Sequence, residues 1–139
     1  MKQEHKELLL KDLCARLPYG VVCHIENASD FEDLLQPYDD KVSFGLLDRF
    51  RGHQFDLKPY LRPMYSMTDE EKKEVSALLN YEFYVDDDYA LAAEDDRHRI
   101  GLDLMMIYID WLNEHQFDYR GLIEKGLALE APEGMYKTE

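Results

Sequence analysis

The sequence contains few cysteines, glycines and prolines, and no long apolar run. Its two cysteines, Cys14 and Cys23, have no CxxC spacing and no histidine at metal-ligand distance, so neither a zinc site nor a dithiol redox centre is predicted. We predict that both thiols are small buried apolar groups in a reducing compartment. The longest apolar run, at 104–109, is too short to cross a membrane. Charges on both sides of the first leucines are not typical of a signal peptide, so we predict a cytoplasmic protein without membrane contact.

Basic residues are also few. The chain has 16 Lys and Arg against 30 Asp and Glu, which gives a formal net charge of −14. Binding to a nucleic acid backbone or to anionic lipid relies on Lys and Arg, so direct binding of either is not predicted. The imbalance is pronounced over residues 65–98, where eleven acidic residues stand against three basic ones.

The chain lacks the short motifs that mark common enzyme classes. It has no P-loop, no GxGxxG, GxSxG or HExxH, and no Cys and His arrangement of a nucleophilic centre. We therefore predict no catalytic residue and no cofactor, and the absence of these motifs favours a protein that is not an enzyme. With 139 residues, of which 45% are hydrophobic, the chain is long enough to bury a core and fold as one globular domain, 1–139.

Hydrophobic spacing predicts a helix and then a small sheet in the N-terminal half. Leucines at three- and four-residue spacing indicate an amphipathic helix that Pro18 ends. Apolar residues that alternate with polar ones, and β-branched runs, indicate strands after it. The expected elements are a helix at 3–17, strands at 20–26 and 41–50, turns at 27–30 and 37–40, a strand or helical turn at 31–36, and a strand or extended segment at 54–61.

The C-terminal half is predicted to be mainly helical. Thr68 and Glu71, three residues apart, predict a capping box at the start of a helix. An acidic connection follows, in which the alanines between 90 and 93 are expected to form one or two helical turns. The apolar segment 99–115 predicts a long helix that is packed on most of its circumference, with Trp111 in the core.

The last segment is predicted to form a further helix. Asp118 is placed to cap its start, and Gly126 is placed to adopt the left-handed conformation at its end. Leu127 and Leu129 are then expected to pack back onto the long helix. The whole pattern predicts an α+β fold with an N-terminal helix, a small antiparallel sheet of about three strands and three helices, the long hydrophobic one packed on the sheet.

Three blocks of the chain are LLLKDLCARLPYGV, LKPYLRPMYSMTDEEKKEV and IDWLNEHQFDYRGLIEKGLALEAPEGMY. Together they cover nearly half of the sequence, and they resemble a family of small uncharacterised proteins from gut bacteria of the Bacteroides type. Members of that family are often associated with prophage or other mobile regions. The resemblance therefore implies an accessory role and no particular reaction. It also implies a helix, then a small antiparallel sheet, then helices.

The acidic connection at 86–98 contains a candidate metal site. Its candidate ligands are Asp86, Asp88, Asp95 and His98, because Ca²⁺ and Mg²⁺ prefer carboxylate oxygens and a neighbouring histidine can tune a site. The spacing lacks the glycine and the final glutamate of an EF-hand. A solvated acidic loop is the alternative that we prefer.

The long helix carries Asp103, Asp110 and Glu114 on one face, next to His115. Two carboxylates and a histidine could serve acid–base chemistry. The alternative, which we prefer, is that this face is the exposed edge of a buried helix, since no second element supplies a nucleophile. Together with the acidic connection, the carboxylate pair defines an alternative function, a small hydrolase that depends on a divalent metal.

The segment KPYLRPMYSM contains a candidate partner-binding surface. Tyr60, Met64, Tyr65 and Met67 lie beside two prolines, and tyrosine and methionine are common at adaptable interfaces. The alternative is that these side chains pack beneath the helix that begins after Thr68.

The preferred function is a non-enzymatic accessory protein that binds an unidentified protein partner through its acidic surface and the Tyr/Met segment. A more specific version is a DNA mimic, whose carboxylates take the place of phosphates on a nucleic-acid-binding protein. Self-association into a homo-oligomer is a further hypothesis, which a measurement of size against concentration tests.

Overall fold

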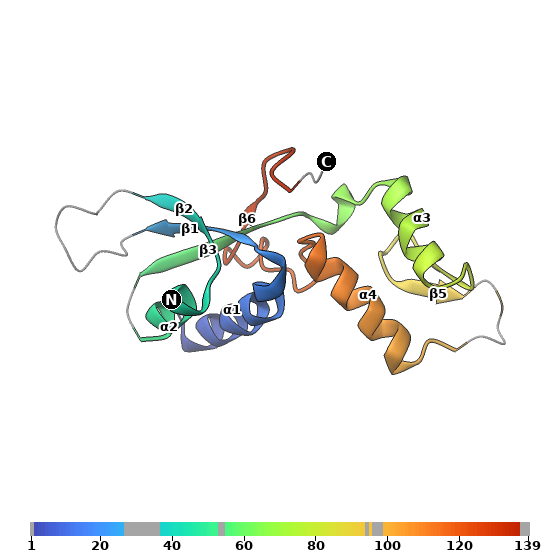
Figure 1. Ribbon diagram of the computed structural model, residues 1–139, viewed down its shortest axis with the longest axis horizontal. Coiled ribbons are helices and arrows are strands. Elements are labelled where there is room, and N and C mark those ends of the chain that lie inside the picture. The colour runs from blue at the N-terminus through green and yellow to red at the C-terminus, as the bar shows by residue number, and fades with distance from the viewer. Residues whose placement is uncertain (1, 27–36, 53–54, 94, 96–98, 137–139) are drawn as a thin grey trace.

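The computed structural model describes residues 2–26, 37–52, 55–93, 95 and 99–136 of the chain. Its elements lie towards two ends of an elongated molecule (Figure 1). One end, the sheet lobe, contains α1 (Gln3–Arg16), the 3₁₀ turn η1 (Leu17–Tyr19), β1 (Val22–Glu26), β2 (Tyr38–Lys41), α2 (Phe44–Gly52), β3 (Asp56–Leu61) and β6 (Leu129–Glu130). The other end, the hairpin lobe, contains η3 (Met64–Ser66), α3 (Asp69–Leu78), β4 (Phe83–Val85), β5 (Leu91–Ala93) and α4 (Leu102–Glu114).

The sheet lobe is built on four strands in the order β2-β1-β3-β6. Strand β1 pairs antiparallel with both β2 and β3, so that Cys23 lies opposite Asp40 on one side and Pro59 on the other. The short β6 pairs with β3 in parallel. The α+β class and the small sheet are therefore confirmed, while the expected three antiparallel strands are joined by a fourth, parallel strand and by a separate β4–β5 hairpin.

Two helices cover one face of this sheet. In Figure 1, α1 and α2 both lie below the strands. Strand residues that alternate inward, such as Cys23, Ile25 and Leu57, pack with Leu13 of α1 and Phe50 of α2 in one core. Burial of this apolar surface is the main stabilising contribution to the lobe.

The expected strand at 41–50 is wrong, because residues 44–52 form helix α2. Leu46, Leu47 and Phe50 are buried at helical spacing, and the backbone N–H of Leu46 donates to Ser43 Oγ as in an N-terminal cap. Phe44, which fitted the alternating pattern, is 79% exposed. The apolar residues of this segment therefore satisfied two periodicities, and packing against α1 and the sheet selects the helical one.

The expected turn at 37–40 is also wrong. Residues 38–41 form strand β2, whose four side chains are all exposed. Its sequence is polar and has no alternation of apolar and polar residues, so no strand was predicted. Backbone pairing with β1 forms the strand. The expected elements at 27–30 and 31–36 lie outside the described residues.

The helical turns expected at the alanines between 90 and 93 do not form. That segment forms β5, which pairs antiparallel with β4. Asp86 shapes the connecting turn, because its Oδ1 accepts hydrogen bonds from the N–H groups of Asp88 and Ala90. Alanine is a good helix former, but here Leu91 enters the core and the backbone completes a hairpin.

The capping box at the start of α3 is confirmed. Glu71 N–H donates to Thr68 Oγ1, and Thr68 N–H donates to Glu71 Oε1. Trp111 of α4 is buried as predicted, and it packs with Val75 of α3 and with Phe83 of β4. The long helix does not pack on the four-stranded sheet, because its core partners belong to the hairpin lobe and include Phe83 and Val85 of the two-stranded β4–β5 sheet.

The further helix expected after Asp118 does not form. Asp118 accepts hydrogen bonds from the N–H groups of Leu122 and Ile123, which lie four and five residues on and not two or three as for an N-cap. The chain then makes successive turns, because Gly121 has φ of +71° and so leaves the right-handed helical region. Gly126 is left-handed as predicted, and Leu127 packs in the core of the sheet lobe instead of on α4.

The two cysteines differ in burial. Cys23 is buried in β1, and burial together with Asp40 raises the pKa of its thiol to about 12. Cys14 is exposed, so the prediction that it is buried is wrong. Within the described ranges, no helix is both long and apolar enough to cross a membrane.

Candidate interaction surface

Helix α4 has apolar side chains on two of its faces. On the first face, Tyr108, Trp111 and Leu112 are buried in the core of the hairpin lobe. Their polar atoms have partners there, since the Tyr108 hydroxyl donates to the carbonyl of Tyr89 and Trp111 Nε1 donates to Glu74 Oε2. This face anchors α4 in the hairpin lobe.

The second face is exposed. Leu102, Met105, Met106 and Ile109 follow the three-, four- and seven-residue spacing of one helical stripe, and Leu102 is 78% exposed. We define the α4 patch as the residues of this stripe: the exposed Leu102, Met105 and Met106, and the half-buried Ile109. Single exposed apolar residues are normal on a protein surface, but several on successive turns of a helix of 13 residues form a candidate interaction site.

Acidic side chains border the α4 patch. Asp103, Asp110 and Glu114 are exposed and lie seven and four residues apart, which places them on one flank of the helix. We call them the acidic flank. Helix α4 contains no Lys or Arg, and the exposed Arg99 lies just before its start. The α4 patch therefore has a negative border along most of its length.

The predicted partner-binding residues take different positions. Met67 is 6% exposed and belongs to the core of the hairpin lobe, against which Met64 also packs. Tyr60 lies on β3, where its hydroxyl donates to Asp39 Oδ1. Tyr65 is 70% exposed. The structure thus packs both methionines beneath the start of α3 and leaves Tyr65 at the surface.

The predicted metal ligands are distributed along the connection. Asp86 and Asp88 lie in the β4–β5 turn, Asp95 is exposed, and His98 lies outside the described residues. Among the residues that the structure describes, no group of three or more His, Cys, Asp or Glu side chains could hold a metal ion. A metal site that includes the remaining residues of this connection stays a prediction.

His115 faces the hairpin lobe and not the acidic flank. Its ring centroid lies 4.3 Å from that of Trp111, and its Nε2 lies 3.6 Å from Glu74 Oε2. Asp110 and Glu114 are exposed on α4. The chain therefore presents the two predicted acid–base carboxylates to solvent and uses the histidine to pack against α3.

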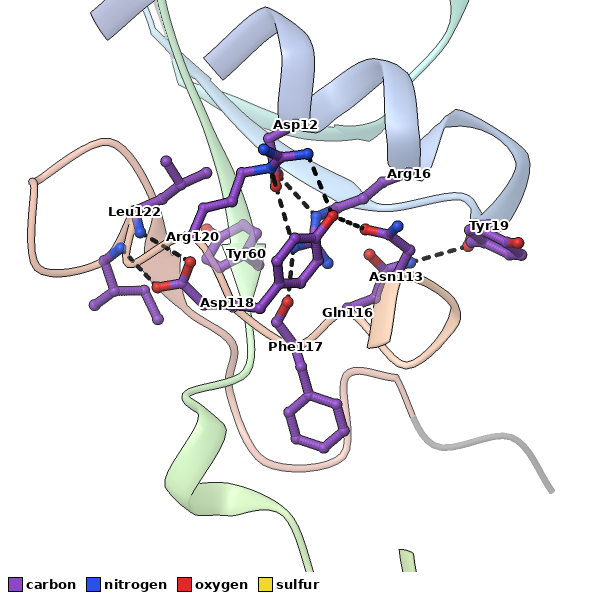
Figure 2. Close-up of polar contacts among 12 residues, drawn as sticks. Asp12, Arg16, Tyr19, Tyr60, Asn113, Gln116, Phe117, Asp118, Arg120 and Leu122 are labelled. Carbon is purple, nitrogen blue, oxygen red and sulfur yellow. Dashed lines mark hydrogen bonds and ion pairs between the residues drawn. The ribbon is translucent and has the colours of Figure 1, made fainter. Parts of the chain in front are cut away.

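A buried polar cluster joins the two lobes (Figure 2). Asp12 and Arg16 of α1 are fully buried and form an ion pair of 2.8 Å. Arg16 Nη2 also donates to the carbonyl of Phe117, and Arg120 Nε lies 3.1 Å from Asp12. The four-residue spacing of Asp12 and Arg16 on a helix was the only sequence signal for this pair. Its role is to fix α1 against the segment that follows α4.

A second polar cluster lies on the sheet face opposite α1 and α2. His24 Nδ1 lies 2.8 Å from Asp39, and its Nε2 lies 2.9 Å from Glu26. Hydrogen bonds to these carboxylates raise the pKa of His24. An adjoining hollow of about 360 Å³ is lined by His24, Glu26, Asp56, Lys58 and Leu129. Both ring nitrogens of His24 have carboxylate partners, and the contact with Asp39 links β1 to β2.

Comparisons with family models, with curated protein sequences and with solved structures found no match. The resemblance to small proteins of Bacteroides-type gut bacteria stays a prediction. The surface that the fold itself singles out is the α4 patch.

Proposed function

We propose that the protein binds another protein through the α4 patch and has no catalytic role of its own. One observation carries the proposal: α4 buries one apolar face in the hairpin lobe and exposes a second. Complete burial of a large apolar side chain stabilises a complex by about 1.5–3 kcal/mol. Three or four such side chains on one stripe provide the centre of an interface that an amphipathic partner segment can cover.

The side-chain types of the patch support a binding role. Met105 and Met106 are adjacent in sequence and lie at the middle of the patch. Methionine is flexible and polarisable, so it adapts to partner surfaces of different shape. The proposal keeps the binding function expected from the sequence and moves its main surface from the Tyr/Met segment to α4.

Substitution of Met106 by glutamate tests the proposal. Met106 is 55% exposed, so Met106→Glu places a charge in the patch without disturbing the core. Phe44→Glu is the matched control, because Phe44 is an exposed apolar residue of the sheet lobe. Each tagged protein is used to capture partners from a lysate of its own host at low salt.

We expect a partner that the wild type and Phe44→Glu both retain and that Met106→Glu loses. Circular dichroism of the variants checks that the fold is intact. If every captured protein binds all three forms equally, the α4 patch is not the binding surface.

The DNA mimic remains a more specific form of this proposal. Eleven acidic residues over 65–98, together with the acidic flank of α4, support it. A mimic binds a protein that normally binds nucleic acid, so excess duplex DNA should displace the partner, and raised salt should release it. Retention of the partner in the presence of excess DNA would contradict mimicry and leave binding through α4 intact.

A further inference from the structure

We infer that the α4 patch takes a basic amphipathic helix of a different protein. The inference rests on the proposed function, since it names the class of partner that the same surface binds. Its basis is the combination of an apolar stripe with an acidic border on one helix.

The shape of the surface favours a helix as the partner. The stripe from Leu102 to Ile109 runs along α4 for about 10 Å, at a rise of about 1.5 Å per residue. A second helix that lies along it can place its own residues at three- and four-residue spacing between those of α4. Met105 and Met106 allow the contact to adjust to residues of different size.

The charge of the border favours a basic partner. Asp103, Asp110 and Glu114 lie along one flank of α4, and the helix has no cationic residue of its own to neutralise them. Lys or Arg residues that flank the apolar stripe of the partner helix would lie next to these carboxylates. Such complementary charges accelerate association and exclude acidic partners.

The same charges disfavour a second copy of this chain. When two α4 helices pair antiparallel through their patches, the same flank of each helix faces its counterpart. Asp103 of one copy then lies close to Asp110 of the other, and like charges at such a contact are destabilising. Each chain also carries a formal net charge of −14, which opposes association of identical copies.

Two synthetic peptides test the inference. Both are amidated amphipathic helices with leucine at the apolar positions, and they carry either lysine or glutamate at every polar position. Binding of each fluorescently labelled peptide to the full-length protein is measured by anisotropy at low salt. We expect the lysine peptide to bind the wild type and the glutamate peptide not to bind.

Two triple variants separate the acidic flank from the net charge of the protein. The test variant is Asp103→Asn, Asp110→Asn and Glu114→Gln. The control makes the same change in net charge at exposed acidic residues elsewhere: Glu4→Gln, Glu124→Gln and Glu133→Gln. We expect the test variant to weaken binding of the lysine peptide about tenfold, since each exposed charge pair contributes modestly, and the control to weaken it about twofold or less.

The outcomes distinguish failure of the partner class from failure of the proposed function. Equal weakening in the two triple variants would overturn the basic partner, while a loss of binding in Met106→Glu would still support α4 as the surface. A concentration-dependent dimer that Met106→Glu abolishes, seen by sedimentation velocity, would also overturn the inference in favour of a second copy. If Met106→Glu leaves peptide binding unchanged and no dimer forms, both the partner class and the α4 interface are wrong.

Discussion

The two lobes differ in how far they cover their own apolar surface. In the sheet lobe, α1 and α2 cover one face of the four-stranded sheet, and Leu122 and Leu127 of the C-terminal segment complete the same core. In the hairpin lobe, α3 and a two-stranded hairpin cover only one face of α4. Helix α4 has more apolar surface than these short elements can bury. An exposed apolar face therefore arises where an element has two apolar faces and neighbours for only one.

The largest effect is expected at the buried cluster that joins the lobes. Arg16→Ala leaves Asp12 buried with only Arg120 beside it and removes the donor to the carbonyl of Phe117. Loss of one partner of a buried ion pair costs about 3–5 kcal/mol in the free energy of unfolding. Urea denaturation measures this loss, and separation into two transitions would show that the lobes unfold independently without the cluster.

The control for this substitution is Arg51→Ala. Arg51 pairs with Asp48 on α2, and both side chains are 73% exposed, so its removal should change the free energy of unfolding by less than about 1 kcal/mol. Similar losses for the two arginines would mean that burial does not distinguish them.

A smaller effect is expected from two leucines on opposite faces of α4. Leu112 is 3% exposed and Leu102 is 78% exposed. Leu112→Ala should lower the free energy of unfolding by about 2–5 kcal/mol, whereas Leu102→Ala should change it by about 0.5 kcal/mol or less. Thermal and urea unfolding compare the two. A comparable loss in Leu102→Ala would show that the second face is covered in the protein, and would remove the contrast between the lobes.

The smallest effect is expected from pH, and only in the sheet lobe. Asp39 of β2 and Glu26 of β1 raise the pKa of His24 above its unfolded value of 6.5, and Tyr60 and Lys58 of β3 lie on the same sheet face. Because the pKa is higher in the folded state, protonation of His24 stabilises the fold, and this contribution is complete below pH 6.5. This contribution is lost as pH rises through the folded-state pKa.

The His24→Gln variant isolates this contribution. The stability difference between wild type and variant should shrink as pH rises from below 6.5 to well above it. Protection factors in amide hydrogen exchange should fall with it at Ile25 of β1 and stay constant at Val75 of α3. A difference that is independent of pH, or that also appears at Val75, would contradict the assignment to His24.

Local patterns were sufficient for several elements. The capping box at Thr68 was predictable because both of its hydrogen bonds join residues three positions apart. The helix that became α1, the strands β1 and β3 and the apolar character of α4 were predictable for the same reason. Residues 41–50 were assigned wrongly because their apolar residues fit a strand and a helix, and contacts with α1 and β1 decide between the two.

The candidate surface was only half predictable. Its apolar residues and its acidic flank could be read from the sequence, but the helix was expected to be packed on most of its circumference. Met64 and Met67 showed the reverse error, since they were candidates for the surface and pack in the core. Residue type alone does not tell which apolar face is covered, because the covering residues come from other elements.

The acidic charge of this protein, the start of α3, the helical nature of α4 and the presence of a small sheet were all predictable from the amino-acid sequence. These properties depend on composition or on neighbours within one turn of a helix. The tertiary structure decided which face of α4 is buried, that α2 is a helix, and that Arg16 meets Phe117 across 101 positions of the chain. The physical reason is that burial and pairing depend on contacts between distant segments, which periodicity along the chain does not record.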